Sequence, residues 1–100
     1  MSAEGVVARE IRRRLEEAFA PQTLEITDES ERHRGHAGWR EGGETHFRVL
    51  LVSAVFEGVP RLERQRRIHA LLADLLRERI HALSVRALTP EEAARADPGG

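Results

Sequence analysis

The sequence predicts an α+β domain with the element order α-β-β-α-β, in which a three-stranded mixed sheet carries the helices on one face. Three observations predict this fold. Two long segments repeat apolar residues every three or four positions, three short segments alternate apolar and polar residues, and the segments occur in this order. A length of 100 residues fits one domain. We expect it to span residues 1–90, with 91–100 as a flexible tail that contains a helical turn at 91–94.

Each predicted helix has an apolar stripe. The first, from about Ala3 to Phe19, places most of its charged residues opposite the stripe and is stopped by Pro21. The second, from about Arg61 to Arg79, follows the chain breakers Gly58 and Pro60. The stripes consist of Val7, Ile11, Leu15 and Ala18 in the first helix, and of Ile68, Leu71, Leu72, Leu75 and Leu76 in the second.

Three segments have the period of a strand. Leu24–Asp28 and Ala82–Leu88 alternate apolar and polar residues, and Thr45–Ser53 is rich in β-branched and large apolar residues. The first two strands along the chain are antiparallel if they form a hairpin. The second and third are joined by a helical crossover, so they are parallel if they are adjacent. The residues expected to face the helices include Phe47, Val49, Leu51, Leu83, Val85 and Ala87.

Composition excludes several kinds of chemistry. The chain has no cysteine, which rules out disulfides, a thiol nucleophile and a self-contained iron-sulfur or thiolate zinc site. Every basic side chain is arginine, so lysine-based chemistry is also excluded. A net charge of −1 gives no global attraction to nucleic acid. With no apolar run of signal-peptide or membrane-spanning type, we expect a cytoplasmic chain that has no membrane partner.

The histidines are concentrated around the connection between the first two predicted strands. Three of the five, His33, His36 and His46, lie in or next to this polar, glycine-rich segment, and His81 stands just before the third strand. Imidazole is a metal ligand and a proton-transfer group near neutral pH. A cluster in a connecting segment therefore indicates a site more than a core.

Five short motifs, in order and at matching intervals, resemble the BolA family over about residues 5–90. The family fold resembles a class II KH domain that lacks the Gly-x-x-Gly loop, in agreement with the topology predicted above. The motifs are Asp28-Glu29-Ser30-x-x-His33, Gly43-Glu44-Thr45-His46-Phe47, Val52-Ser53-x-x-Phe56-x-Gly58, Arg64-x-Arg66 and His81-Ala82-Leu83-Ser84.

The resemblance implies an adaptor that binds a monothiol glutaredoxin of the CGFS type. In such heterodimers a two-iron two-sulfur cluster is shared: the glutaredoxin cysteine and glutathione ligate one side, and the BolA-like protein supplies a loop histidine or cysteine and a histidine near its C-terminal strand. The absence of cysteine fits the histidine-loop version of the family. Its implied role is iron-sulfur cluster trafficking or iron and redox regulation.

The same resemblance ranks the ligands. His81 falls on the family's C-terminal histidine, and the loop motif selects His33 narrowly over His36, three residues further on. His46 has the opposite parity to Phe47, so we expect it to point away from the helices as a partly exposed structural histidine or a further ligand. His69 lies beside the stripe of the second helix, where a packing role is expected.

Two other classes of function remain to be weighed. A KH-like regulator that binds DNA would use the basic residues of the second helix, although this chain has Arg-Gln-Arg where the family commonly has Arg-His-Arg. The same basic face, placed near His81, is also a candidate surface for glutathione or an acidic partner patch. Alone, the chain is expected to be a monomer or a weak homodimer. These basic residues are Arg61, Arg64, Arg66 and Arg67.

An enzyme is the least favoured class. The loop histidines with Asp28, Glu29 or Glu44 could form acid-base pairs, and Ser30 could be a nucleophile. Their spacing matches no catalytic template, and an exposed loop neither excludes water nor fixes geometry. We therefore expect no enzymatic activity.

Overall fold

A mixed three-stranded sheet forms the centre of the molecule. Its strands are β1 (Thr23–Asp28), β2 (His46–Val52) and β3 (Ala82–Leu88), in the order β1-β2-β3. β1 and β2 are antiparallel, whereas β2 and β3 are parallel. The computed structural model describes residues 5–30 and 43–96. The predicted α+β class is confirmed, and because the strands are neighbours in this order, their directions are those expected for adjacent strands.

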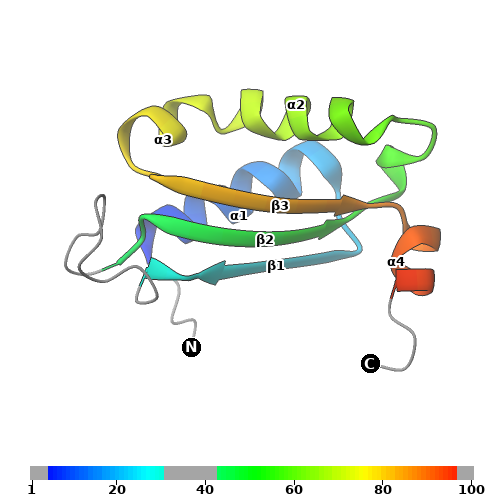
Figure 1. Ribbon diagram of the computed structural model, residues 1–100, viewed down its shortest axis with the longest axis horizontal. Coiled ribbons are helices and arrows are strands. Elements are labelled where there is room, and N and C mark those ends of the chain that lie inside the picture. Colours follow the sequence, from blue (N-terminus) through cyan, green and yellow to red (C-terminus); the bar gives the residue numbers. More distant parts are fainter. Residues whose placement is uncertain (1–4, 31–42, 97–100) are drawn as a thin grey trace.

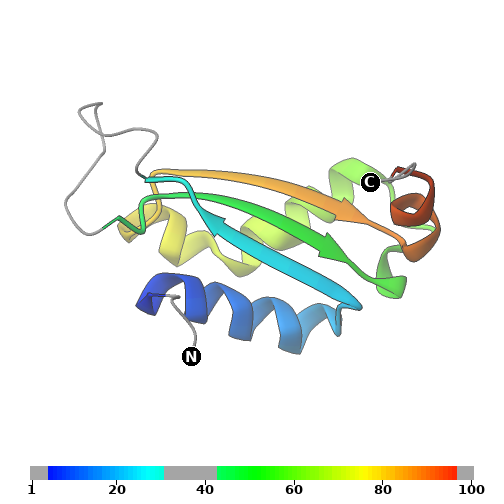
Figure 2. The same cartoon turned by 90° about the horizontal axis from the view of Figure 1, so that it is seen from below.

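Three helices cover one face of this sheet (Figure 1). They are α1 (Val6–Phe19), α2 (Arg61–Leu71) and α3 (Ala73–Glu78), and the short 3-10 helix η2 (Ala54–Phe56) connects β2 to α2. In Figure 2 the strands lie in front of α2 and α3, and the other face of the sheet is toward the viewer. Within the described ranges, no helix is long and apolar enough to cross a membrane.

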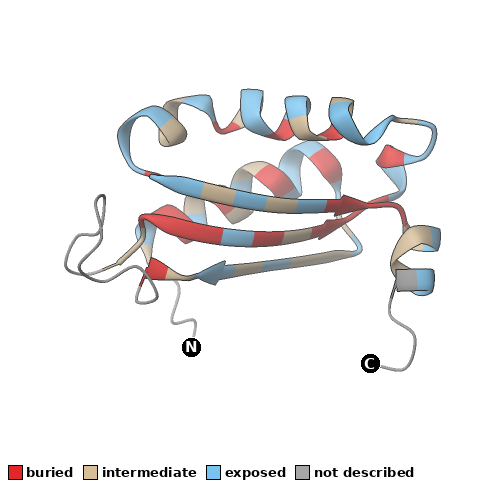
Figure 3. Ribbon diagram, in the orientation of Figure 1, coloured by how far each residue is buried: buried red, intermediate tan, exposed pale blue. Residues whose placement is uncertain are grey.

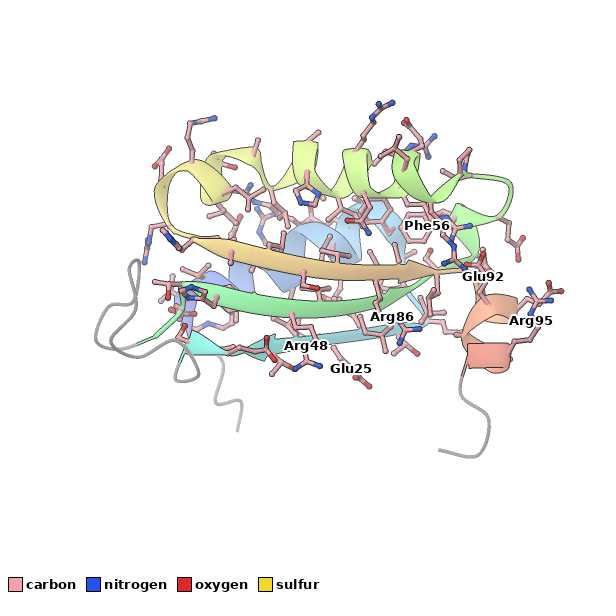
Figure 4. All side chains as sticks on the ribbon, in the orientation of Figure 1. Glu25, Arg48, Phe56, Arg86, Glu92 and Arg95 are labelled. Carbon is pink, nitrogen blue, oxygen red and sulfur yellow. The ribbon has the colours of Figure 1, made fainter. Side chains whose placement is uncertain are left out.

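The core lies between the sheet and the helices, as the burial colours of Figure 3 show. Alternate residues of β2 face it, and the stripes of α1 and α2 close it from the other side. The opposite face of the sheet carries charged side chains: Glu25, Arg48 and Arg86 lie on the side away from the helices (Figure 4). The most deeply buried core residues are Ile11, Leu15, Leu51, Phe56, Ile68 and Leu72.

The second predicted helix is divided at Leu72. Its dihedral angles, φ −105° and ψ 12°, leave the helical region, so that α2 ends and α3 begins there. The bond from Leu72 N to Ile68 O is kept at 3.1 Å, which makes the break local. The apolar stripe continues across it because Leu72 remains fully buried.

The C-terminal segment differs from the predicted tail. Residues 90–96 form a further helix, α4 (Pro90–Ala96), beyond the C-terminal end of β3, whereas 97–100 lie outside the described residues. Thr89 and Glu92 form a capping box: Glu92 N donates to Thr89 Oγ1 at 3.1 Å, and Thr89 N donates to Glu92 Oε1 at 2.9 Å. The helical turn expected at 91–94 is therefore part of a longer helix, α4.

Side chains of α2 cover part of the outer edge of β3. Leu88 O accepts a hydrogen bond from Ser53 N at 2.9 Å, so the carbonyls of even-numbered residues in β3 face β2, and those of odd-numbered residues face outward. Gln65 Nε2 donates to Val85 O at 2.9 Å, and Arg64 Nη1 donates to Ala87 O at 3.0 Å.

Candidate functional site

Two histidines meet at the end of the sheet where β2 and β3 begin. His46 is the first residue of β2 and pairs in register with Ala82, the first residue of β3. His81 directly precedes Ala82, and the ring centroids of His46 and His81 are 5.5 Å apart, with the planes tilted by 48°. The parallel strand pairing, rather than any flexible segment, thus brings the two imidazoles together.

His46 is buried rather than partly exposed. Only 6% of its surface is accessible, and its Nδ1 lies 2.8 Å from Thr45 Oγ1. The sequence prediction used strand parity to place His46 off the core face, and it equated that face with solvent. His46 is covered by residues that are not adjacent to it in sequence. The alternation of residues along the strand could therefore not predict that His46 is buried.

His81 is exposed, but its backbone is fixed. His81 N donates to Thr45 O at 2.7 Å, and Ala82 N donates to the same oxygen at 3.1 Å. The preceding residue, Ile80, is buried in the core. His81 therefore presents an accessible imidazole from a fixed position of the backbone.

Asp28 and Ser30 organise the base of the site. Asp28 Oδ1 accepts from Ser30 Oγ at 2.6 Å and from Ser30 N at 2.9 Å, while Asp28 Oδ2 accepts from Glu44 N at 2.9 Å. Ser30 Oγ in turn accepts from Thr45 N at 3.0 Å and from His46 N at 3.3 Å. The carboxylate and hydroxyl imagined as an acid-base pair and a nucleophile thus connect the two strands beside the histidines.

Glu44 joins the same region to the first helix. Its Oε2 accepts from Ala8 N at 3.0 Å, so its carboxylate lies at the N-terminus of α1. Glu44 has φ +65° and follows Gly43 at φ +77°, a left-handed pair that turns the chain into β2. A Cβ atom added to Gly5 would lie 2.3 Å from Glu44 Cδ, so the glycine leaves room for the carboxylate.

The other predicted histidines differ in outcome. His33 and His36 lie outside the described residues, which end at Ser30 and resume at Gly43, both at this end of the sheet. His69 is exposed, and its Nδ1 lies 2.8 Å from Gln65 O one turn earlier in α2. The expected packing role of His69 is wrong because its place beside the apolar stripe is already on the solvent side of the helix.

The basic residues of α2 do not form a single exposed cluster. Arg64 is only 5% exposed and binds the carboxylate of Glu92, so its proposed role in binding nucleic acid or a partner is not consistent with its burial. Arg61, Arg66 and Arg67 are exposed. Arg67 pairs with Glu63 at 3.2 Å, and Arg61 lies 3.9 Å from Glu92.

These residues also lie at the wrong end of the molecule to meet His81. α2 begins near the C-terminal end of β2, and the chain returns through α3 to the start of β3 (Figure 1). The basic residues beside His81 are instead Arg77 and Arg79, which line a small hollow of about 180 Å³ together with His81 and Ile80. The crossover topology could have predicted that residues at the end of the second helix lie beside His81, because the last turn of such a helix returns to the start of the next strand.

The described residues bring two imidazoles together but contain no complete metal site. Among them, no group of three or more histidine, cysteine, aspartate or glutamate side chains could hold a metal ion. The two imidazoles of His46 and His81 lie close together, and the chain has no thiolate. A metal held by these residues would therefore need further ligands from outside the described part of the chain.

Three kinds of comparison with known proteins identify the family of the chain. The family model described as BolA-like protein matches residues 15–92. BolA-like protein 1 from Homo sapiens is 48% identical over 90 residues, which are 90% of this chain and 63% of that protein. The chain therefore spans slightly less than two thirds of the length of this relative.

A solved structure and a bacterial relative agree. The BolA domain of SufE1 from Arabidopsis thaliana superposes with a TM-score of 0.80 at 42% identity, over 90% of this chain and 99% of that domain. A DNA-binding transcriptional regulator BolA from Haemophilus influenzae is 37% identical over 82 residues, covering 82% of this chain and 76% of that protein. With the fold, the motifs and these matches in agreement, the chain belongs to the BolA family.

Proposed function

We propose that the chain is an adaptor that binds a monothiol glutaredoxin of the CGFS type and shares a glutathione-containing two-iron two-sulfur cluster with it. Its role would be in iron-sulfur cluster trafficking or in iron and redox regulation, not in catalysis. The observation that carries the proposal is the pairing of His46 and His81 at one end of the sheet, with 5.5 Å between their ring centroids.

The ligand chemistry explains why a partner is needed. The chain supplies nitrogen ligands only, because it has no cysteine. A cluster held on this side by neutral imidazole would have a higher potential than one held by four thiolates, and its bonds would weaken when the imidazoles are protonated. Such a site suits transfer or sensing better than permanent storage. His81 is the first candidate ligand, with His33, His36 or His46 as the second.

The surface around His81 carries two arginines and one glutamate. Arg77 and Arg79 are exposed there, and Glu78 between them lies 4.0 Å from Arg77. Glutathione carries two carboxylates, which arginine binds with directed hydrogen bonds. We expect these two residues, rather than Arg66 and Arg67, to contact glutathione or an acidic patch of the glutaredoxin.

The test is a titration of the chain into a cluster-loaded monothiol glutaredoxin with glutathione, under anaerobic conditions, followed by visible absorption and circular dichroism. We expect the cluster spectrum to change on addition of the wild-type chain and not on addition of His81→Ala. Single His33→Ala, His36→Ala and His46→Ala variants would then identify the second ligand. An unchanged spectrum with the wild-type chain would overturn the proposal.

Charge reversal provides a matched pair of variants on one helical segment. Arg77→Glu with Arg79→Glu should weaken glutaredoxin binding at least about tenfold, because two attractive charges become repulsive ones near the site. Arg66→Glu with Arg67→Glu, in the middle of α2 and about ten residues away along the chain, is the control and should leave the affinity unchanged. Equal effects of the two pairs would show that only net charge matters.

Binding of DNA is the second candidate function, favoured by the name of the Haemophilus influenzae relative and by the exposed Arg61, Arg66 and Arg67. The burial of Arg64 and the pairing of Arg67 with Glu63 reduce the charge available. Gel-shift affinity measured against salt concentration decides the question, because each phosphate contact contributes about −0.9 to the slope of log K against log salt. A slope near zero would exclude this function.

A cytoplasmic location and a monomer or weak homodimer remain predictions of the sequence.

A further inference from the structure

A single peptide unit, between Thr45 and His46, connects the end of β1 to the start of β3. Its N–H group belongs to His46 and donates to Ser30 Oγ at 3.3 Å. Its carbonyl belongs to Thr45 and accepts from His81 N at 2.7 Å and from Ala82 N at 3.1 Å. A trans peptide unit directs its N–H and its carbonyl to opposite sides, so this one is held from both sides at once.

The hydrogen bonds through this peptide unit all point the same way. Backbone N–H groups only donate and carbonyls only accept, so the direction at the peptide is fixed. Ser30 Oγ accepts from the N–H groups of Thr45 and His46, at 3.0 and 3.3 Å. Its hydrogen is donated to Asp28 Oδ1 at 2.6 Å, since an ionised carboxylate only accepts. The series that begins at His81 N therefore ends at a carboxylate, and bonds that share a direction strengthen one another.

The carbonyl of Thr45 also fixes the direction of the His81 side chain. His81 N belongs to the peptide unit before the His81 Cα, and Ala82 N belongs to the unit after it. Because both N–H groups donate to one oxygen, both flanking units are held, and with them the direction of the Cα–Cβ bond. The His81 side chain is exposed, so its position depends on this backbone more than on packing. Ser30 and Thr45 are 1% and 0% exposed, which keeps water from competing for these bonds.

We infer that Asp28 and Ser30 are positioning residues for His81, although they lie at or just after the end of β1 and His81 lies before β3. They act through the peptide unit between Thr45 and His46, which Ser30 holds on one side and which holds His81 on the other. The meaning for a shared cluster rests on the proposed function, in which His81 is the first candidate ligand. The fixed backbone of His81 does not rest on it and can be measured without metal.

The test is amide hydrogen exchange, measured by NMR on the protein without metal. We expect the amides of His81 and Ala82 to be protected, although both residues are exposed. In Ser30→Ala both should exchange at least about tenfold faster relative to the Val49 amide in the middle of β2, because the peptide unit loses its bonds on the β1 side. Wild-type amides of His81 and Ala82 that exchange at the rate of an unstructured peptide would overturn the inference without any variant.

Asp28→Asn is a milder variant of the same series. It keeps an acceptor for the Ser30 hydroxyl and removes the charge at the end of the series, so it should accelerate exchange of the His81 and Ala82 amides by a smaller factor. An unchanged ratio to Val49 in folded Asp28→Asn would contradict the role of Asp28, whether or not Ser30→Ala folds.

Ser53→Ala is the matched control at the other end of the sheet. Ser53 is also 1% exposed, and its hydroxyl donates to Phe19 O and accepts from Val55 N. The variant should lower overall stability without accelerating exchange at His81 beyond that at Val49. If Ser30→Ala behaves in the same way, Ser30 only stabilises the fold and the positioning role is wrong.

The two proposals fail separately. If His81 binds the shared cluster, Ser30→Ala should change the circular dichroism of the glutaredoxin-bound cluster relative to the wild-type complex, and Ser53→Ala should not. A wild-type protein with protected His81 and Ala82 amides that does not alter this cluster would contradict the proposed function and leave the positioning role intact. A wild-type protein that alters the cluster, but whose two amides exchange as fast as in Ser30→Ala, would contradict only the positioning role.

Discussion

Arg64 joins four parts of the chain through one buried guanidinium group. It donates to Val59 O at 2.7 Å, to Ala87 O at 3.0 Å and to the two carboxylate oxygens of Glu92 at 2.6 and 3.3 Å. Its Cζ also lies 5.7 Å from the centroid of the Phe56 ring, and Figure 4 shows Phe56 and Glu92 in the same region. These contacts connect the entrance of α2, the end of β3 and α4.

We expect Arg64→Ala to lower the free energy of unfolding by about 3 kcal/mol, because it leaves Glu92 and two carbonyls without their charged partner. Urea unfolding monitored by circular dichroism measures the change. The exposed Arg66→Ala on the same helix is the control, with a change within about 0.5 kcal/mol. Similar losses for both variants would mean that helix charge, not the buried contacts, carries the effect.

Gly5 matters through a side chain 39 positions away in sequence, since its missing Cβ leaves room for the carboxylate of Glu44. Gly5→Ala should displace that carboxylate from the start of α1 and cost about 1 kcal/mol, the value of a helix cap. Thermal unfolding measures it. In a Glu44→Ala background the same Gly5→Ala change should cost nothing, and an unchanged cost there would contradict the explanation.

The burial of Arg64 and His46 could not be predicted from residue type or spacing. Both side chains were assigned to accessible surfaces, since arginine and histidine are usually exposed and neither lies in an apolar stripe. Their partners are distant in sequence: Glu92 is 28 positions from Arg64, and Ser30 is 15 positions from Thr45. Periodicity reports which face a residue occupies, but not what covers that face.

At the scale of elements, α4 shows how a local pattern can be missed. Thr89-Pro90-Glu91-Glu92 has a capping residue, proline at the first helical position and glutamate three residues after the cap, which together predict a helix start. Only a helical turn at 91–94 was predicted here, because the glycines and proline at 98–100 favour a fraying end. The break between α2 and α3, by contrast, has no such sequence signal. Leu72 alone leaves the helical region, and the apolar stripe continues across it because Leu72 stays buried.

The attachment of α4 should depend on pH. Hydrogen bonding to Arg64, followed by the bond from Thr89 N, lowers the pKa of Glu92 from 4.5 to about 2. A carboxylate whose pKa is lower in the folded state stabilises that state fully above about pH 4.5 and loses this contribution as the pH falls toward 2. Hydrogen exchange of the α4 amides, followed through this range, should show progressive loss of protection.

The control for this prediction is Glu92→Gln, which removes the titrating group. Its α4 amides should already exchange faster at neutral pH, and their protection should change much less between pH 4.5 and 2. A variant with the wild-type pH profile would show that another group is responsible.

At the scale of the whole molecule, acid should loosen several contacts in the same range. Arg13 and Arg14 lower the pKa of Glu10 to about 2, and Arg14 does the same for Asp74, whose two oxygens it binds at 2.6 and 3.0 Å. These pairs lie within α1 and between α1 and α3, far from α4. The urea midpoint should therefore fall as the pH decreases from 4.5 to 2. Asp74→Asn should reduce the size of that fall, whereas an identical pH profile would contradict this account.

The two ends of the molecule should respond independently to substitution. Thr45 stands at the start of β2 and Arg64 near the far end of β3, a separation of roughly 20 Å for strands of seven residues. The losses of unfolding free energy for Thr45→Val and Arg64→Ala should add in the double variant to within about 0.5 kcal/mol. A larger deviation, measured by urea unfolding, would reveal coupling along the sheet.

The topology was predictable because the order and period of the segments leave few arrangements, and all three strand positions were confirmed to within about two residues. The site was predictable only in part. The motifs single out His81 as a candidate ligand, but the proximity of His46 to His81 requires the register between β2 and β3, which no pattern within either strand determines.

The side chains on the outer edge of β3 have a consequence for self-association. An exposed edge strand offers its outward carbonyls to a strand of another molecule, and this is a common route to polymerisation. In this chain Gln65 and Arg64 already occupy the carbonyls of Val85 and Ala87. A second copy could pair with this part of the sheet only by displacing a guanidinium group that also holds α4, so Arg64 opposes strand addition at the β3 edge.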